Sequence, residues 1–190
     1  STVLVVTDYF LSPEDYELNF KLGPFLWLLL LVTLMMPLQT SFEEYMFRGY
    51  LMQGIGALAK NRWVPLVTTS VIFGLMHLGN PEIGKIGYIA IIAYLGSGFF
   101  LGIITLMDEG LELALGFHAA NNMVTALLVT ADWTAFQTHS VFKDVSDPNV
   151  GLEVFLPVLV IYPILIAIFA KKYKWTNWKE RLTGKGLPSK

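Results

Sequence analysis

Four ionisable side chains that can perform acid–base chemistry lie among otherwise apolar stretches of this chain. Glu43 and Glu44 follow one apolar run, and His77 and His118 each lie within a later one. A carboxylate can take a proton from water, and a histidine can assist the carboxylate or hold it in position. A second histidine and the NH₂ group of Asn122 can donate hydrogen bonds to a developing oxyanion. These residue types together are the set that hydrolysis of a peptide bond requires.

The composition indicates that these side chains lie in a membrane. The chain of 190 residues is 54% hydrophobic and 15% charged, below the roughly 25% charged residues of a soluble domain. Its mean hydropathy is +0.56. An ionisable group in hydrocarbon costs roughly 2.5–3.5 kcal/mol, so such groups normally face a bundle interior and act there. The chain has no cysteine, which excludes disulfides and thiolate metal sites.

The apolar runs predict helices, several of them long enough to span a membrane. They cover residues 22–39, 40–58, 63–78, 86–107, 110–130 and 152–170. Pro37 is expected to kink or stop the first of them. No alternation with period two is long enough for a β-barrel, and backbone amides in lipid must be satisfied within their own segment. We therefore expect an all-α fold, a polytopic transmembrane helix bundle with a polar active-site cavity inside the membrane.

Two features predict how these helices pack and how they are oriented. Glycines within the run 86–107 are expected to allow close helix contacts; they are Gly87, Gly96, Gly98 and Gly102. Residues 171–190 carry seven Lys or Arg and one Glu, so the positive-inside rule places this tail in the cytoplasm. Counting back through the spans puts the turn 60–62 on the same side and the loop 131–150 outside.

The glutamate pair has a partial structural explanation. Ser41 and Glu44 fit a capping box at the start of a helix, and Arg48 is one turn after Glu44, where it can pair with it. Neither feature explains Glu43, which points about 100° away around the helix. Local spacing leaves Glu43 open to a structural or a functional interpretation.

The histidines also have two interpretations each. His77 is near the end of its helix, where the helix dipole favours an imidazole and Phe73 would pack on the same face. His118 and Asn122 share one helix face and would both need buried partners, which favours a functional role. His139 lies in a polar loop and is expected to be solvated. One shared site explains the polar pairs together, whereas a structural interpretation needs a separate reason for each.

The motifs Glu-Glu-x-x-x-Arg, Phe-x-x-x-His and His-x-x-x-Asn, in this order, resemble the membrane-embedded CAAX prenyl endopeptidase and bacteriocin-processing (CPBP) family. The residues that carry the resemblance are Glu43, Glu44 and Arg48, then Phe73 with His77, then His118 with Asn122. Each pattern alone recurs by chance, but all three on separate hydrophobic helices make a specific match. The resemblance covers about residues 22–130.

The resemblance implies an intramembrane endopeptidase in which Glu43 is the general base and His77 cooperates with it. His118 and Asn122 would form the oxyanion site. Glu44, Arg48 and Phe73 would be supporting residues. Glu43, His77 and His118 would also be acceptable zinc ligands by residue type, although there is no His-Glu-x-x-His motif. Of the two alternatives, we favour catalysis that requires no cofactor.

The expected organisation follows from these motifs. Residues 1–21 are interpreted as the remnant of a longer chain, 22–170 as the membrane-embedded protease domain and 171–190 as a cytoplasmic tail. We expect a multi-pass protein of a bacterial inner membrane. Its expected partners are the lipid bilayer and a membrane-associated peptide or protein substrate, prenylated or not, rather than nucleic acid.

Two other functions would use the same buried groups. A non-catalytic membrane scaffold or bacteriocin self-immunity protein would use the polar residues only to hold helices together. A proton-coupled carrier would also need buried ionisable residues, but the chain has no internal repeat of the kind many transporters show.

Overall fold

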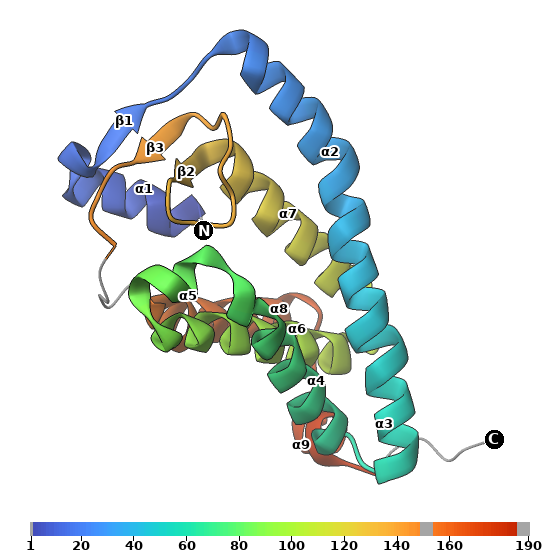
Figure 1. The fold of residues 1–190 in the computed structure, drawn as a ribbon. Helices are drawn as coiled ribbons and strands as arrows, with labels where there is room; N and C mark the ends of the chain where they lie inside the picture. The colour runs from blue at the N-terminus through green and yellow to red at the C-terminus, as the bar shows by residue number, and fades with distance from the viewer. Residues whose placement is uncertain (1, 149–153, 186–190) are drawn as a thin grey trace.

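A computed structural model of the chain describes residues 2–148 and 154–185. This part is mostly helical, as the apolar runs predict (Figure 1). The α-helices are α1 (Thr2–Leu11), α2 (Leu22–Glu44), α3 (Met52–Ala59), α4 (Trp63–Leu75), α5 (Pro81–Ile86), α6 (Ile91–Asp108), α7 (Glu112–Leu128), α8 (Tyr162–Lys172) and α9 (Trp178–Thr183). The shorter helical turns are 3₁₀ at Pro13–Asp15, Met76–Gly79 and Tyr88–Ala90, and π-helical at Tyr45–Leu51 and Pro157–Ile161.

The first long helix does not stop where the sequence predicts. α2 continues through the π-helical turn into α3 and forms one helix of 38 residues, Leu22–Ala59. Pro37 lies inside α2, so the predicted boundary between residues 39 and 40 is wrong. The hydroxyl of Thr40 donates a hydrogen bond of 2.9 Å to the carbonyl of Met36. Pro37 lacks an N–H, so the carbonyl of Thr33 loses its helical donor, but the helix on either side is unbroken, as membrane helices tolerate.

The predicted capping box at Ser41 is wrong for the same reason. Ser41 lies in the interior of the helix, and its carbonyl accepts a hydrogen bond from the backbone amide of Tyr45. No helix begins at this point. The carboxylate of Glu44 is therefore directed to other partners.

In the described residues, two helices are long and apolar enough to cross a membrane, namely Leu22–Ala59 and Tyr88–Asp108, with 38 and 21 residues. Trp63–Gly79 is a shorter apolar helix. The predicted spans 110–130 and 152–170 correspond to α7, with 17 residues, and to α8, with 11 residues after a π-helical turn. The first residues of the latter span lie outside the described residues.

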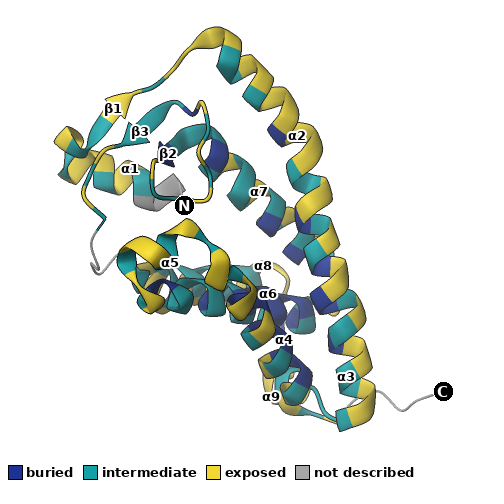
Figure 2. Cartoon of the chain, in the orientation of Figure 1, coloured by how far each residue is buried: buried dark blue, intermediate teal, exposed yellow. Residues whose placement is uncertain are grey.

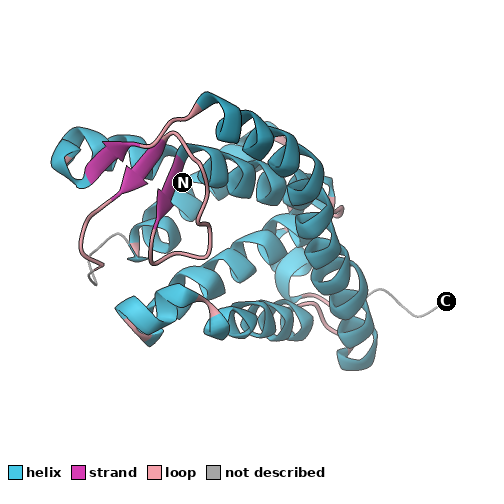
Figure 3. Cartoon of the chain, turned by 45° about the horizontal axis from the view of Figure 1, so that its top comes forward, coloured by secondary structure: helices cyan, strands magenta, loops and turns pink. Residues whose placement is uncertain are grey.

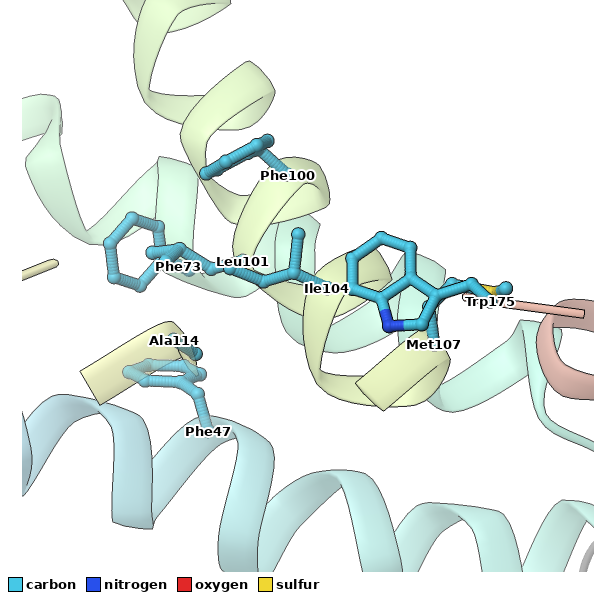
Figure 4. Close-up of a cluster of buried hydrophobic side chains, with 8 residues drawn as sticks. All are labelled: Phe47, Phe73, Phe100, Leu101, Ile104, Met107, Ala114 and Trp175. Carbon is cyan, nitrogen blue, oxygen red and sulfur yellow. The ribbon is translucent and has the colours of Figure 1, made fainter. Parts of the chain in front are cut away.

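The core forms where α4 lies along α6 and where α2 lies along α7. Figure 2 shows that the buried residues concentrate between these helices, whereas the outer face of α2 is largely exposed. The buried apolar cluster in Figure 4 consists of Phe47, Phe73, Phe100, Leu101, Ile104, Met107, Ala114 and Trp175. It joins residues from α4, α6, α7, the π-helical turn and the C-terminal segment.

Glycines on α6 allow close helix contacts, as predicted. A Cβ at Gly98 would lie 2.7 Å from the carbonyl oxygen of Ser70 on α4, and Gly96 and Gly102 are also crowded by neighbouring side chains. Gly87 differs, because no described atom lies within 4 Å of its Cβ position. Its φ of 78° ends α5, a conformation that glycine adopts without a steric penalty.

A small sheet at one end of the molecule was not predicted (Figure 3). Its strands are β1 (Tyr16–Leu18), β2 (Val129–Ala131) and β3 (Phe142–Asp144), in the order β1-β3-β2. β1 is antiparallel to β3, and β2 is parallel to it. Strands of three residues are too short to show a period-two pattern. The all-α prediction is corrected to mostly helical, with residues 16–18 paired to the loop after α7.

The C-terminal segment packs against the rest of the chain. Trp175 is only 7% exposed, and its Nε1–H donates a hydrogen bond of 3.1 Å to the carboxylate of Asp108. Asn61 and Lys185 form an isolated β-bridge. The turn 60–62 and the tail are therefore adjacent, and the side of the membrane on which they lie stays a prediction.

Candidate functional site

The predicted polar residues meet at one cavity of about 580 Å³. Glu43 reaches it from the end of α2, and His77 from the 3₁₀ turn after α4. His118 and Asn122 reach it from successive turns of α7. The volume is within the range of small-ligand sites, roughly 300–1,000 Å³. Three helices that are distant in sequence thus supply one set of polar side chains.

Beneath the cavity wall lies a buried charged cluster of Glu44, Arg48 and His118. Glu44 and Arg48 have fully buried side chains, and Arg48 Nη1 donates to Glu44 Oε1 at 3.0 Å. His118 Nδ1 donates to the same oxygen at 2.8 Å. Arg48 Nη2 donates to the carbonyl of Gly98 at 3.0 Å. The predicted Glu44–Arg48 pair is confirmed, and Glu44 additionally links α2 to α7.

The bond between His118 and Glu44 orients the imidazole. With Nδ1 bound to Glu44, the other ring nitrogen, Nε2, faces Glu43 at 3.9 Å from its Oε2. This distance is longer than a hydrogen bond. The two carboxylates of the pair therefore lie on opposite sides of one imidazole, Glu44 bonded to it and Glu43 across a gap.

Glu43 faces the cavity and is less buried than its neighbour. Its side chain is 21% exposed, whereas that of Glu44 is 0% exposed. Gln39, one turn earlier in α2, donates a hydrogen bond to Oε1 of Glu43. His77 and His118 both interact electrostatically with this carboxylate. Glu43 is thus an accessible carboxylate held by one amide and flanked by two imidazoles.

His77 is held by its own helix and by α6. Its Nδ1 donates to the carbonyl of Phe73 at 2.8 Å, which leaves Nε2 as the accepting nitrogen of a neutral ring. The imidazole stacks on Tyr94, with ring centroids 4.2 Å apart. Phe73 contacts the rings of both His77 and His118 and lies 4.5 Å beneath the guanidinium carbon of Arg48. Phe73 is therefore a spacer between the buried cluster and the two histidines.

Two neighbouring asparagines complete this wall of the cavity. Asn121 donates a hydrogen bond of 3.4 Å to Oδ1 of Asn122, and both line the cavity. With Oδ1 engaged, the NH₂ group of Asn122 is its available donor. His139 is exposed, as predicted, and does not line the cavity.

Sequence reasoning missed other residues that line the cavity. Among them, Asn80 donates a hydrogen bond of 2.9 Å to the hydroxyl of Tyr94, and Glu82 accepts one of 2.9 Å from the backbone amide of Ala135. Trp133 lines the cavity beside them. The segment 79–81 indicated only the end of a helix, and no spacing in the sequence connects it to the loop after α7.

The candidate zinc ligands were Glu43, His77 and His118. Within residues 2–148 and 154–185, no three His, Asp or Glu side chains are arranged so that they could hold a metal ion. The preference for catalysis without a cofactor stays a prediction.

Comparison with known proteins agrees with the resemblance in the motifs. The family described as type II CAAX prenyl endopeptidase Rce1-like matches residues 22–124. The chain is 39% identical over 157 residues to the uncharacterized protein YyaK of Bacillus subtilis strain 168, a match covering 80% of this chain. It spans about half, 52%, of the length of that relative. No solved structure was found to match this chain. Neither comparison supports the bacteriocin-immunity alternative.

Proposed function

This chain belongs to the Rce1-like family of type II CAAX prenyl endopeptidases, and we propose that it is an intramembrane endopeptidase whose general base is Glu43. Family membership and the two candidate spanning helices indicate an integral membrane protein. We further propose that it is a multi-pass bundle of a bacterial inner membrane and that its C-terminal tail is cytoplasmic. This proposal is supported by the successive apolar runs in the sequence and by the basic residues after position 170.

One observation carries the proposal. Glu43, His77, His118 and Asn122 come from three separate helices and line the same cavity. If these side chains had only structural roles, they would not need to line the same cavity. The cavity combines an accessible carboxylate, two imidazoles and a donor amide, which are the groups that peptide-bond hydrolysis uses.

In the proposed reaction, the carboxylate of Glu43 accepts a proton from water. The hydroxide oxygen forms a bond to the carbonyl carbon of the peptide, and the carbonyl becomes a tetrahedral oxyanion. His77 assists through Nε2, because its Nδ1 donates to the carbonyl of Phe73 and fixes the ring. Gln39 holds one oxygen of Glu43 and so directs the other towards the substrate. The proton on Glu43 then passes to the leaving nitrogen as the C–N bond breaks.

His118 and Asn122 are proposed to stabilise the oxyanion. To donate through Nε2 while Nδ1 donates to Glu44, His118 must carry both protons. The NH₂ of Asn122 is the second donor, one helical turn away on the same face. Removing one such donor typically lowers kcat by about 10²–10³-fold.

Glu44, Arg48 and Phe73 are proposed to be positioning residues. Glu44 orients His118, and Arg48 compensates the charge of Glu44. Phe73 separates the histidines from the guanidinium of Arg48. None of the three has to touch the substrate.

The proposed substrate is a membrane-associated peptide or protein. The proposed mechanism uses no metal, and its support is that no three His, Asp or Glu side chains in the described residues are grouped as metal ligands. Full cleavage after prolonged chelation is the expected result. Activity that chelator removes and zinc restores would contradict it.

The test is cleavage of prenylated and non-prenylated peptide libraries by the chain reconstituted in lipid. Glu43→Gln should lower kcat by at least about 10²-fold, with the thermal unfolding midpoint nearly unchanged, because the amide keeps the shape but cannot take a proton. Glu14→Gln is the matched control, because Glu14 is exposed and outside the cavity, and its activity should equal that of the wild type. Wild-type activity in Glu43→Gln would overturn the proposal.

A further inference from the structure

Acidic side chains outnumber Lys and Arg side chains on the described part of the cavity wall. Three carboxylate residues line it, namely Glu43, Glu82 and Asp144. No Lys or Arg belongs to the described part of that lining. The nearby basic side chains are engaged elsewhere, since Arg48 lies behind Phe73, and Lys143 pairs with Asp132 at 2.8 Å. A substrate that enters this cavity therefore meets an excess of negative charge.

Glu82 lines the same cavity as Glu43, and one of its two oxygens accepts a hydrogen bond from the backbone. Oε1 accepts the hydrogen bond from the amide of Ala135, which fixes the carboxylate between α5 and the loop after β2. Oε2 is buried and accepts no hydrogen bond of ordinary length among the described residues, and the Tyr94 hydroxyl is a polar neighbour of this carboxylate. A buried carboxylate oxygen without a partner is costly, so it is a strong acceptor for an incoming donor.

The surroundings of Glu82 connect it to the catalytic residues. Tyr94 stacks on His77, and its hydroxyl accepts a hydrogen bond from Asn80 and interacts with Glu82. Glu82 is therefore one tyrosine ring away from His77. An extended peptide advances about 3.3 Å per residue, so that span corresponds to about two residues of substrate.

We propose that Glu82 is a specificity residue that receives a Lys or Arg side chain of the substrate within about two positions of the cleaved bond. The inference rests on the proposed peptidase function and names a substrate class for the same cavity. The cation donates to Oε2 of Glu82. The apolar part of its side chain lies along Tyr94 and Trp133, because long basic side chains bury their methylene stems against aromatic surface.

Electrostatics favours a basic residue over the alternatives. A neutral side chain would leave the charge of Glu82 uncompensated, and an acidic one would add a fourth carboxylate to the cavity. The cavity is thus suited to a basic segment of a membrane-associated polypeptide.

The test measures cleavage and binding with matched probes. The probes are short fluorescent peptides of alanine and leucine with a single Lys, Gln or Glu at each position around a central bond. Cleavage is measured with the lipid-reconstituted wild-type chain, and Kd is measured by anisotropy with the Glu43→Gln variant. At one position, Lys should exceed Glu by at least about tenfold in kcat/KM and in affinity, as expected for a partly desolvated charge pair.

Variants of Glu82 then assign the preference to this residue. Glu82→Gln retains an oxygen for the Ala135 amide but loses the charge, so the ratio between Lys and Glu peptides should fall to about threefold or less. Glu82→Asp retains the charge and should keep a preference for Lys, which separates the charge from a purely structural role. Glu14→Gln again serves as the control with an unchanged ratio, and thermal unfolding checks that each variant is folded.

The outcomes separate this inference from the proposed function. Two results would overturn the role of Glu82. One is equal kcat/KM for Lys and Glu peptides with the wild-type chain and equal Kd with the Glu43→Gln variant. The other is a preference for Lys that persists in Glu82→Gln. If Lys peptides bind selectively through Glu82 but no peptide is cleaved, the peptidase proposal fails and the basic-residue site stands.

Discussion

Two groups of charged residues at different places in the molecule show how differently ion pairs can be built. The buried cluster of Glu44, Arg48 and His118 joins α2 to α7 at distances of 2.8–3.0 Å. The tail cluster joins Glu109, after α6, to Arg62 and Arg181 at 3.9 and 3.3 Å. The side chain of Glu109 is 56% exposed, and that of Glu44 is 0% exposed.

The comparison distinguishes two kinds of charged cluster. The buried cluster orients a side chain of the candidate site, whereas the tail cluster only links segments of the chain. Water screens the tail cluster, so each of its pairs contributes little and can be lost without consequence elsewhere. The buried cluster has no such screening, and removal of one partner leaves a charge in an apolar environment. Only the buried cluster touches a residue that lines the cavity, His118. We infer that its retention in the core is related to function rather than to stability.

The largest effect is expected from Arg48→Met. The substitution keeps the volume but leaves Glu44 without its buried cation, and loss of one partner from a buried pair costs about 3–5 kcal/mol. Thermal and denaturant unfolding in detergent would measure the loss in unfolding free energy. The double variant Glu44→Gln with Arg48→Met should be more stable than Arg48→Met alone, because the unpaired charge is gone. A double variant less stable than the single one would contradict this account of the buried cluster.

A smaller effect is expected from Gly98→Ala. The carbonyl of Gly98 accepts the hydrogen bond from Arg48, and an added Cβ would lie 2.7 Å from backbone of Ser70. Separating α6 from α4 should cost about 1–3 kcal/mol of unfolding free energy. The control is Gly54→Ala, where no described atom lies within 4 Å of the Cβ position and alanine is the better helix former. Equal stability of the two variants would show that the close approach of α4 and α6 is not required.

The smallest effect is expected from Glu109→Gln in the tail cluster. Both ion pairs are lost, yet the unfolding free energy should fall by less than about 1 kcal/mol, because exposed pairs are screened. The difference from the wild type should shrink further in about 1 M salt, where the Debye length is about 3 Å. A loss as large as that of Arg48→Met would remove the distinction between the two clusters.

The sequence predicted the features that depend on local spacing. Apolar runs give the helices, and a separation of four residues places Glu44 beside Arg48 and Phe73 beside His77. The resemblance in the three motifs was confirmed by the family match over residues 22–124. The catalytic roles of Glu43, His77, His118 and Asn122 stay predictions.

The features that were missed all depend on contacts between distant segments. The hydrogen bond from His118 to Glu44 joins residues 74 positions apart. Local spacing could not distinguish this role of Glu44 from that of a capping residue paired with Ser41. The helix continues past Pro37 because its hydrogen-bonding environment, and not the proline alone, decides where it ends. Glu82 meets Ala135 only after the loop folds over α5. Such pairings are set by packing, which hydrophobic periodicity does not encode.

The continuous helix Leu22–Ala59 also determines how deep the glutamate lies. Its charge-free opening run, residues 22–39, has 18 residues and a length of about 27 Å at 1.5 Å per residue. That length nearly fills a hydrocarbon layer of about 30 Å. Glu43, four residues further on, is then about 6 Å past the apolar run, close to the headgroups. In the proposed peptidase, water would then not have to cross the bilayer to reach Glu43, whereas the proposed polypeptide substrate would have to be delivered to the membrane boundary.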